Sequence, residues 1–192
     1  MKDFLSARRC LRRRLSGERY RHSLNVMRLC AELAVRQGIS PDRARWAGLL
    51  HDCARDLPIG RLRRYALRSG RKPSSVIRSA DTPGLLHGPV SRTIAQSEFR
   101  LTDRDVLQSI ESHTVGRVPM STLEKIVYVA DYASSDRRFK ASSSIRRLAR
   151  RSFQEAFRRA VMGKIRHVVS RHRVPHPQSL RLLTALLNGF PV

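Results

Sequence analysis

Residues 44–54 read ARWAGLLHDCA, a segment that is helical in pattern and, apart from Arg45, apolar up to the adjacent pair His51 and Asp52. Ser40, followed by a proline and an aspartate, supplies an N-cap and first turn for this helix, which we expect to end near residues 56–58. Neighbouring side chains on a regular helix point about 100° apart. Both side chains can therefore bind one metal ion only if the ion lies between the two directions in which they point.

Helical periodicity also dominates on both sides of this segment. No strand-like alternation longer than four residues and no internal repeat occurs in the sequence. Ser121 and Glu124, three residues apart, resemble a capping box that opens a helix. A turn is expected at residues 82–84 and a proline-containing break at residues 174–177. The further helices that we expect cover residues 22–37, 59–69, 85–99, 103–112, 124–133, 144–171 and 180–187.

The fold class that these patterns predict is all-α. The length of 192 residues favours one domain, so residues 1–192 are expected to form a single unit. We expect its core over about residues 18–135, with basic helices over about residues 144–192 packed on that core.

Composition excludes several classes of protein. The chain is 41% hydrophobic, too apolar for intrinsic disorder, yet it has no run of the ~18 apolar residues that a membrane-spanning helix needs. The first twenty residues lack the apolar stretch and cleavage site of a signal peptide. Cys10, Cys30 and Cys53 form no even disulfide framework. A reducing compartment, the cytoplasm, is therefore expected, with no membrane as a partner.

The charge balance is strongly basic. Lysine and arginine total 39 against 15 acidic residues, which gives a net charge of +24, and only five of the basic residues are lysines. Such a surface attracts nucleic acid, nucleotides and other phosphorylated molecules. The excess of arginine is explained either by a genome that favours arginine codons over lysine codons or by a selected affinity for RNA or polyphosphate. Aromatic residues are only 6% and are not interleaved with the arginines, which disfavours a stacking platform for single strands.

Six residues that can bind metals recur within the apolar helical patterns. A single buried histidine is usually a hydrogen-bonded core residue, but six such positions would each carry the cost of burying a polar group. A shared metal ion removes that cost at once. Histidine with carboxylate suits Fe, Mn, Co or Zn, and helical bundles build such sites by tertiary packing. The six residues are His22, His51, Asp52, His87, His113 and Asp131.

The order of these residues, H…HD…H…H…D, resembles that of the HD-domain metal-dependent phosphohydrolases. The text around them is similar to successive motifs of the bacterial YqeK family, the symmetrical bis(5′-nucleosyl)-tetraphosphatases, which cut diadenosine tetraphosphate into two ADP. The resemblance runs from about Arg19 to Leu187. Its motifs here are RYRHSLNV (19–26), LLHDCARDLP (49–58), LLHGPVSR (85–92), HTVGRVPMSTLEKIVYVADY (113–132) and KIRHVVSRHRVPHPQSL (164–180).

The resemblance implies roles for individual residues. It implies iron, as one or two divalent or mixed-valence ions, with Mn, Co or Zn as further candidates. The residues implied to bind it are His22, His51, Asp52 and Asp131. Those implied to face the phosphates or a second metal are His87 and His113, and those implied to contact or approach the nucleotide are Thr114, Arg137, Val174, Pro175, His176 and Pro177.

The chain departs from the family in two places. Arg55 stands where the family usually has lysine, three residues after the HD aspartate. Residues 133–135, Ala-Ser-Ser, replace isoleucine-glutamate-proline just before Arg137. Because a guanidinium binds phosphate oxygens with its planar fork, Arg55 changes that contact without removing it. The metal residues are intact, so these departures bear on substrate preference.

The mechanism expected from these residues is attack on a phosphorus by a metal-activated water. Asp52 would orient or deprotonate that water. His87, His113, Arg55 and Arg137 would offset the charge on the non-bridging phosphate oxygens, so Asp52 and Arg55 are the candidate catalytic residues.

Two other functions fit the same sequence. One is an HD-domain nucleotidase for another nucleotide, such as a deoxynucleoside monophosphate or a guanosine polyphosphate. The other is an RNA- or ribosome-associated binding protein, whose salt-sensitive RNA binding would survive replacement of His51 and Asp52 by alanine. A homodimer formed through the amphipathic C-terminal helix is a further possibility, by analogy with the family.

Overall fold

The computed structural model describes residues 3–68 and 83–192. These residues form ten helices and no strand, as the periodicity predicted. The helices are α1 (Phe4–Arg14), α2 (Gly17–Arg36), α3 (Pro41–Leu50), α4 (Ile59–Arg68), α6 (Pro83–Ser97), α7 (Arg104–Ser112), α8 (Thr122–Ala133), α9 (Lys140–Ala149), α10 (Phe153–Ser170) and α11 (Pro177–Leu187).

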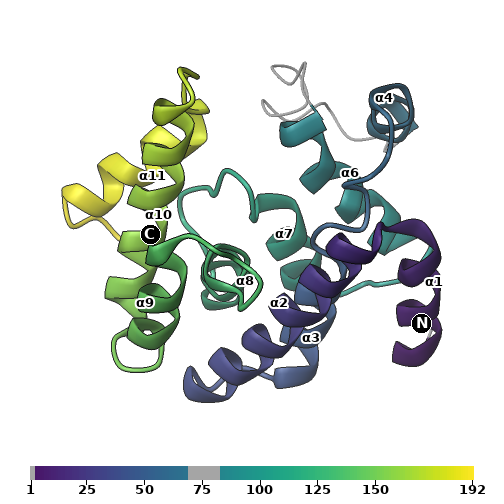
Figure 1. Ribbon diagram of the computed structural model, residues 1–192, viewed down its shortest axis with the longest axis horizontal. Helices are drawn as coiled ribbons and strands as arrows, with labels where there is room; N and C mark the ends of the chain where they lie inside the picture. The colour runs from purple at the N-terminus through teal and green to yellow at the C-terminus, as the bar shows by residue number, and fades with distance from the viewer. Residues whose placement is uncertain (1–2, 69–82) are drawn as a thin grey trace.

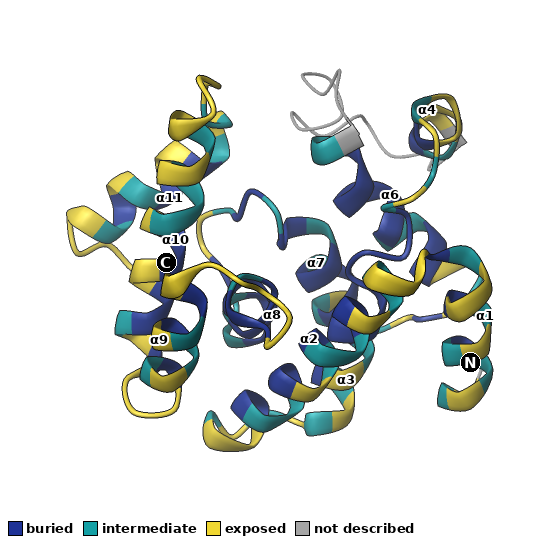
Figure 2. Ribbon diagram, viewed as in Figure 1, coloured by how far each residue is buried: buried dark blue, intermediate teal, exposed yellow. Residues whose placement is uncertain are grey.

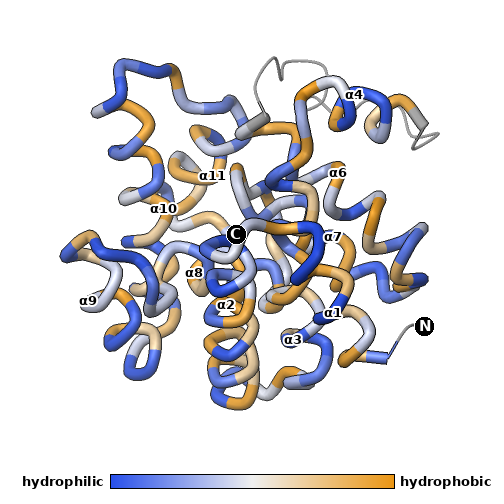
Figure 3. The backbone as a smooth tube through the Cα atoms, turned by 45° about the vertical axis from the view of Figure 1, so that its right-hand side comes forward, coloured by the Kyte–Doolittle hydropathy of each residue, from blue (hydrophilic) through white to orange (hydrophobic). Residues whose placement is uncertain are grey.

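Helix α8 lies at the centre of the arrangement, between the helices up to α7 on one side and α9–α11 on the other (Figure 1). It contacts α2, α3, α7, α9 and α10. Its residues are buried nearly all round, including Ile126, Val127 and Tyr128, whereas the outer helices expose one face (Figure 2). Hydrophilic and hydrophobic stretches accordingly alternate along those outer helices (Figure 3). A helix that is covered on every side belongs to the core.

The expected helix starts depend on side-chain caps that the structure contains. Ser40 accepts a hydrogen bond from the backbone N–H of Arg43, and Asp103 accepts from the N–H groups of the first turn of α7. Ser121 and Glu124 form the complete capping box at the start of α8. These local signals therefore fixed the starts of α3, α7 and α8.

Helix α3 ends earlier than expected, at Leu50 instead of near residues 56–58. From there the backbone hydrogen bonds join residues three apart, as from Cys53 N–H to the Leu50 carbonyl and from Arg55 N–H to the Asp52 carbonyl. The chain thus tightens into a series of turns. The HD pair lies at the start of these turns, directly after the last residue of α3.

The helix expected over residues 144–171 is two helices, and that prediction is wrong. Helix α9 ends at Ala149 and α10 begins at Phe153. No glycine or proline marks the break at residues 150–152. Both helices pack on α8 as well as on each other, which a single straight helix of this length could not do.

Three smaller differences concern helix starts. Helix α1 has no counterpart among the expected helices; it is capped by Asp3 and buries Ala7 and Leu11. Of the turn expected at residues 82–84, residue 82 lies outside the described part and the other two residues begin α6. The last helix begins at Pro177, three residues earlier than expected, because proline fits the first helical position. No helix in the described ranges is long and apolar enough to span a bilayer.

Candidate metal centre

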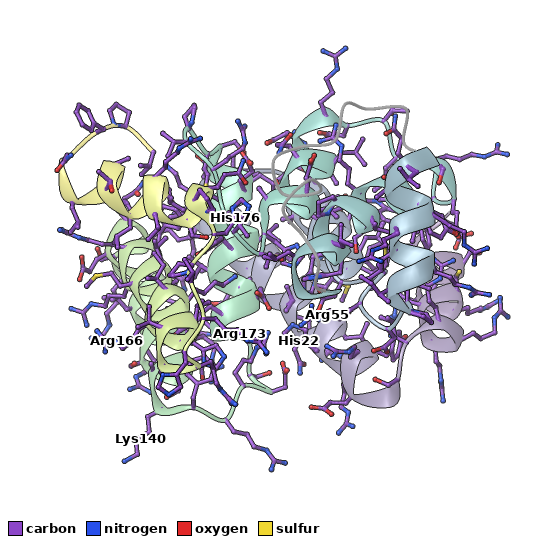
Figure 4. The ribbon with its side chains drawn as sticks, turned by 90° about the horizontal axis from the view of Figure 1, so that it is seen from above. His22, Arg55, Lys140, Arg166, Arg173 and His176 are labelled. Atoms are coloured by element: carbon purple, nitrogen blue, oxygen red, sulfur yellow. The ribbon has the colours of Figure 1, made fainter. Side chains whose placement is uncertain are left out.

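The six metal-capable residues come from five segments of the chain and are all buried. Two groups of three offer ligand atoms within 4.8 Å of one another. In Figure 4, His22 and Arg55 lie near the middle of the molecule, between the two sets of helices. The segments are α2 for His22, the turn after α3 for His51 and Asp52, α6 for His87, the end of α7 for His113, and α8 for Asp131. The groups are His22, His51 and Asp131, and His51, Asp52 and His113.

The turn that carries the HD pair is anchored to α6. The backbone N–H of Ala54 donates to the Ser91 hydroxyl over 3.1 Å, and the Cys53 thiol lies 3.6 Å from the Ser91 carbonyl oxygen. With the turn held in this way, His51 Nε2 and Asp52 Oδ2 are 3.7 Å apart. Both side chains of the pair therefore reach the same cluster.

His51 is oriented as a metal ligand. Its Nδ1 lies 2.8 Å from the Gly48 carbonyl oxygen, which can only accept, so Nδ1 carries the hydrogen. The lone pair of the neutral ring is then on Nε2, which is buried and has no hydrogen-bond partner. Burial lowers the pKa of His51 to about 3, which keeps the ring neutral. A buried nitrogen without a partner is costly unless something binds it, so the residues fit a metal ion.

His113 and His87 are held in opposite tautomers. His113 Nδ1 faces the Ile110 carbonyl oxygen at 2.7 Å, so it donates there and presents the Nε2 lone pair, 3.5 Å from Asp52 Oδ1. His87 Nδ1 lies 2.8 Å from an Arg55 guanidinium nitrogen, which can only donate. Its hydrogen is then on Nε2, 3.0 Å from Asp52 Oδ1. His87 in this arrangement is a hydrogen-bond donor toward Asp52.

The end of α7 is shaped to place His113. Gly116 has a φ of +70°, the left-handed conformation that favours glycine at a helix C-terminus. Its N–H bonds to the Ser112 carbonyl over 2.7 Å, and an added Cβ would overlap the Leu182 side chain. Thr114 lies within this turn, with its hydroxyl 3.2 Å from His87 Nε2 and 3.1 Å from His113 Nε2.

Asp131 is surrounded by cations. Its Oδ1 accepts from Arg137 over 2.6 Å and lies 3.2 Å from His22 Nε2, while Oδ2 accepts from Lys164 over 2.9 Å. Burial would raise the pKa of Asp131, but Lys164, His22 and Arg137 together hold it well below its usual value. For Asp52, burial is likewise outweighed by the neighbouring histidines, beginning with His51, and its pKa is also low. Both carboxylates are ionised and able to bind a cation.

Asp136 is a functional candidate that the sequence patterns did not single out. Its Oδ2 lies 2.8 Å from His22 Nδ1, and its Oδ1 accepts from the Asn25 amide over 3.2 Å. Burial disfavours protonated His22, but the hydrogen bonds with Asp131 and Asp136 raise the pKa of its ring to about 9. A carboxylate on Nδ1 leaves Nε2 to face the cluster, the usual arrangement behind a metal-bound histidine.

Replacing Asp136 by alanine is expected to weaken metal binding by about 10–100-fold, because His22 loses the group that orients its ring. Titration of the metal-free protein with Co²⁺ measures this affinity directly. The Asp42→Ala variant is the control, since that carboxylate is exposed at the start of α3. An unchanged affinity in Asp136→Ala would show that His22 needs no such support.

Two cavities meet at the cluster. One, of about 410 Å³, exposes His22, Asp52, His87, His113 and Asp131, together with Arg55 and Arg137. The other, of about 880 Å³, shares Thr114, Asp131 and Arg137 with the first and extends between α8, α9 and α10. These volumes are in the range of small-molecule sites. A polyanionic molecule can therefore lie against the cluster in the smaller cavity and continue into the larger one.

The structure does not bring every candidate residue to the cluster. Val174 is 89% exposed, and His176 caps α11, where its Nδ1 accepts from the backbone N–H of Gln178. Within the described chain, none of residues 174–177 lines either of these two cavities. Lys164, by contrast, lies on Asp131 and was not among the candidates. Its one signal in the sequence was its position at the start of the last family-like motif.

Comparisons with known proteins agree with this geometry. Residues 19–136 match the model of the HD domain family. The chain is 30% identical to a symmetrical bis(5′-nucleosyl)-tetraphosphatase of Bacillus subtilis, over 94% of this chain and 95% of that protein. It is 31% identical to a protein of the same name from Staphylococcus aureus, over 74% and 72% of the two chains. A crystal structure of a "predicted HD superfamily hydrolase involved in NAD metabolism" from Clostridium acetobutylicum superposes with a TM-score of 0.90, at 33% identity and 98% coverage of both chains.

Proposed function

The chain belongs to the HD domain family, and we propose that it is a symmetrical bis(5′-nucleosyl)-tetraphosphatase, which hydrolyses diadenosine tetraphosphate to two ADP. Relatives of that name match it over most of its length. The observation that carries the proposal is the buried cluster itself, in which His51 Nε2 has no partner among the described residues. A histidine and carboxylate cluster beside a cavity rich in basic side chains fits a metal-dependent reaction on phosphates.

The residues that would hold the metal are His22, His51, Asp52 and Asp131. The two ligand groups share His51, which supports one or two ions. We propose iron, since imidazole and carboxylate suit it, although Mn, Co or Zn have the same ligand preferences. When bound, such a metal supplies a Lewis acid and lowers the pKa of a water molecule.

Asp52 is the group that we propose to orient the attacking water and take its proton. Its low pKa keeps it ionised, and the His87 N–H at 3.0 Å fixes its Oδ1. Arg55 in turn fixes His87 through Nδ1. Arg55 stands at the position where the family usually has lysine. There it holds His87 through a hydrogen bond and also lines the smaller cavity. The departure from the family has a defined structural role in this chain.

Arg137 and Thr114 are the groups that we propose to bind the nucleotide phosphates. Both line the two cavities where they meet. Arg137 donates to the Asp131 backbone carbonyl and side chain, so its guanidinium is held beside the cluster. Residues 174–177 lie outside both cavities, and a nucleotide contact there requires the substrate to extend beyond them.

Analysis of the products tests the proposed reaction. Purified protein loaded with metal is expected to convert diadenosine tetraphosphate to two ADP, and in ¹⁸O-water one of the two ADP molecules carries the label on its terminal phosphate. Chromatography with mass spectrometry measures both. ATP plus AMP would contradict symmetrical cleavage. Turnover of a deoxynucleoside monophosphate or guanosine tetraphosphate, with none of the dinucleotide, would favour the other nucleotidase function.

The wider setting of the enzyme is also part of this proposal. Because α8 contacts helices from both parts of the chain, we propose one domain over residues 1–192. The three cysteines are free thiols, which supports a reducing location such as the cytoplasm. Nucleic-acid binding through the arginine-rich surface and pairing into a homodimer are separate proposals, and neither is needed for the reaction.

A further inference from the structure

Lys164 is a buried cation that the proposed reaction does not use. It lies on α10, and its side chain is 17% exposed. Its ammonium donates to Asp131 Oδ2 over 2.9 Å and to the His113 backbone carbonyl over 2.8 Å. It also lies 3.9 Å from the centre of the Tyr128 ring, a favourable cation–π contact. One lysine thus joins two of the segments that build the cluster.

These contacts leave little for a substrate to bind. An ammonium has three donors; two are used in hydrogen bonds, and the third lies against the aromatic ring. Burial lowers the pKa of Lys164, opposed by the Asp131 charge. Arg137, by comparison, is 40% exposed at its side chain and can turn toward a phosphate. Lys164 also lines the larger cavity, but its two hydrogen bonds are both made to the residues of the cluster, and these place it to act on Asp131.

Gly163, next to Lys164 on α10, makes room for a neighbour of Asp131. Tyr132 directly follows Asp131 on α8, and a Cβ at residue 163 would overlap the Tyr132 hydroxyl. The glycine therefore lets the Tyr132 side chain lie against α10, beside the lysine that binds Asp131.

The two oxygens of Asp131 have different neighbours. Oδ1 is the oxygen nearer the histidines, at 3.2 Å from His22 Nε2 and 4.0 Å from His51 Nε2. It also accepts from Arg137, whose side chain is 40% exposed and can turn away toward a phosphate. Oδ2 is the oxygen that Lys164 binds. A carboxylate can bind a metal through one oxygen or through both. The neighbour of Oδ2 therefore decides which of the two modes is open to Asp131.

We propose that Lys164 is a positioning residue that occupies Asp131 Oδ2, so that this carboxylate binds the metal through Oδ1 alone. The inference rests on the proposed metal centre. Its consequence is that one coordination position, which a bidentate aspartate would fill, stays available for water and substrate. Open positions of this kind distinguish catalytic metal sites from structural ones.

The test compares Lys164→Met with the wild-type protein after loading with Co²⁺, whose visible absorption reports the number and geometry of its ligands. Methionine keeps the length and apolar stem of lysine but cannot donate. We expect a changed absorption spectrum and a kcat about 10–100-fold lower, with KM for the dinucleotide within about threefold. Lys125→Met is the matched control, because Lys125 also lies over an aromatic ring, that of Phe157, away from the cluster. It should leave the spectrum and kcat unchanged.

An unchanged spectrum in Lys164→Met overturns the inference, whatever happens to turnover, since a packing role alone would not alter the ligands. If the methionine variant does not fold, Lys164→Arg decides. It keeps a charged donor, so its spectrum must match that of the wild type, and a shifted one overturns the inference. If the wild-type protein binds no Co²⁺, both the proposed metal centre and this inference are contradicted. Protein that binds Co²⁺ but leaves the dinucleotide intact contradicts only the proposed substrate.

Discussion

Replacement of His51 and Asp52 by alanine is expected to lower hydrolysis of diadenosine tetraphosphate by about 10³-fold or more, while the chain stays folded. The change removes two proposed metal ligands and the proposed base together. Folding should survive because neither side chain is part of the apolar core. The variant loses the bonds from His51 Nδ1 to the Gly48 carbonyl and from His87 to Asp52, but it also removes a buried carboxylate. The turnover rate with saturating metal measures the loss of hydrolysis, and circular dichroism measures whether the chain stays folded.

The same variant separates the enzyme from an RNA-binding protein. If salt-sensitive RNA binding is the main activity, it persists in the double variant with its affinity unchanged. Hydrolysis that also persists would place the reaction elsewhere in the molecule. Arg45→Ala, on the helix that leads into the same turn, is the matched control: its side chain is exposed and pairs with Asp42 at the start of that helix, so the variant should retain hydrolysis.

Arg117→Ala is expected to lower the free energy of unfolding by about 1.5 kcal/mol, less than the loss for a fully buried pair because the Arg117 side chain is 38% exposed. Glu124 is fully buried, and Arg117 binds both of its oxygens, over 2.7 and 3.0 Å. Ser112 and the backbone N–H of Ser121 add further hydrogen bonds to the same carboxylate. Loss of the arginine leaves a buried charge without its counter-ion. Chemical denaturation followed by circular dichroism measures the difference.

Two further variants make this prediction specific. Arg117→Ala combined with Glu124→Gln should be more stable than Arg117→Ala alone, because the uncompensated charge is removed as well. Arg104→Ala, an exposed position at the start of α7, should change stability by less than about 0.5 kcal/mol. If the double variant is no more stable than Arg117→Ala alone, the unpaired charge of Glu124 does not lower the stability of the folded protein.

The fold was predictable from the sequence where local signals agree with tertiary packing. The capping box at Ser121 and the apolar period after it located α8, and the serine cap located α3. The break between α9 and α10 was not predicted, because it serves packing on α8 and carries no proline or glycine. Ser152 and Glu155 have the spacing of a capping box, but the Ser152 side chain makes no capping hydrogen bond at the start of α10.

The six metal-capable residues could be singled out in the sequence because their chemistry is out of place in apolar helices, and the structure brings them into one cluster. Asp136 and Lys164 could not, since each is one charged residue in an arginine-rich stretch and their roles depend on segments far away in the sequence. Asp136 meets His22 across 114 residues. No spacing rule encodes that contact. The tautomers of His51, His87 and His113 likewise depend on partners that only the folded chain supplies.

The dispersal of the cluster over five segments has a consequence for biosynthesis. His22 leaves the ribosome early, but Asp131 follows more than a hundred residues later, and the helix that carries Lys164 comes later still. A growing chain that has made only α2, α3 and the turn after α3 holds two histidines and one aspartate of the set. The six residues can therefore come together only after α8, which carries Asp131, has been made.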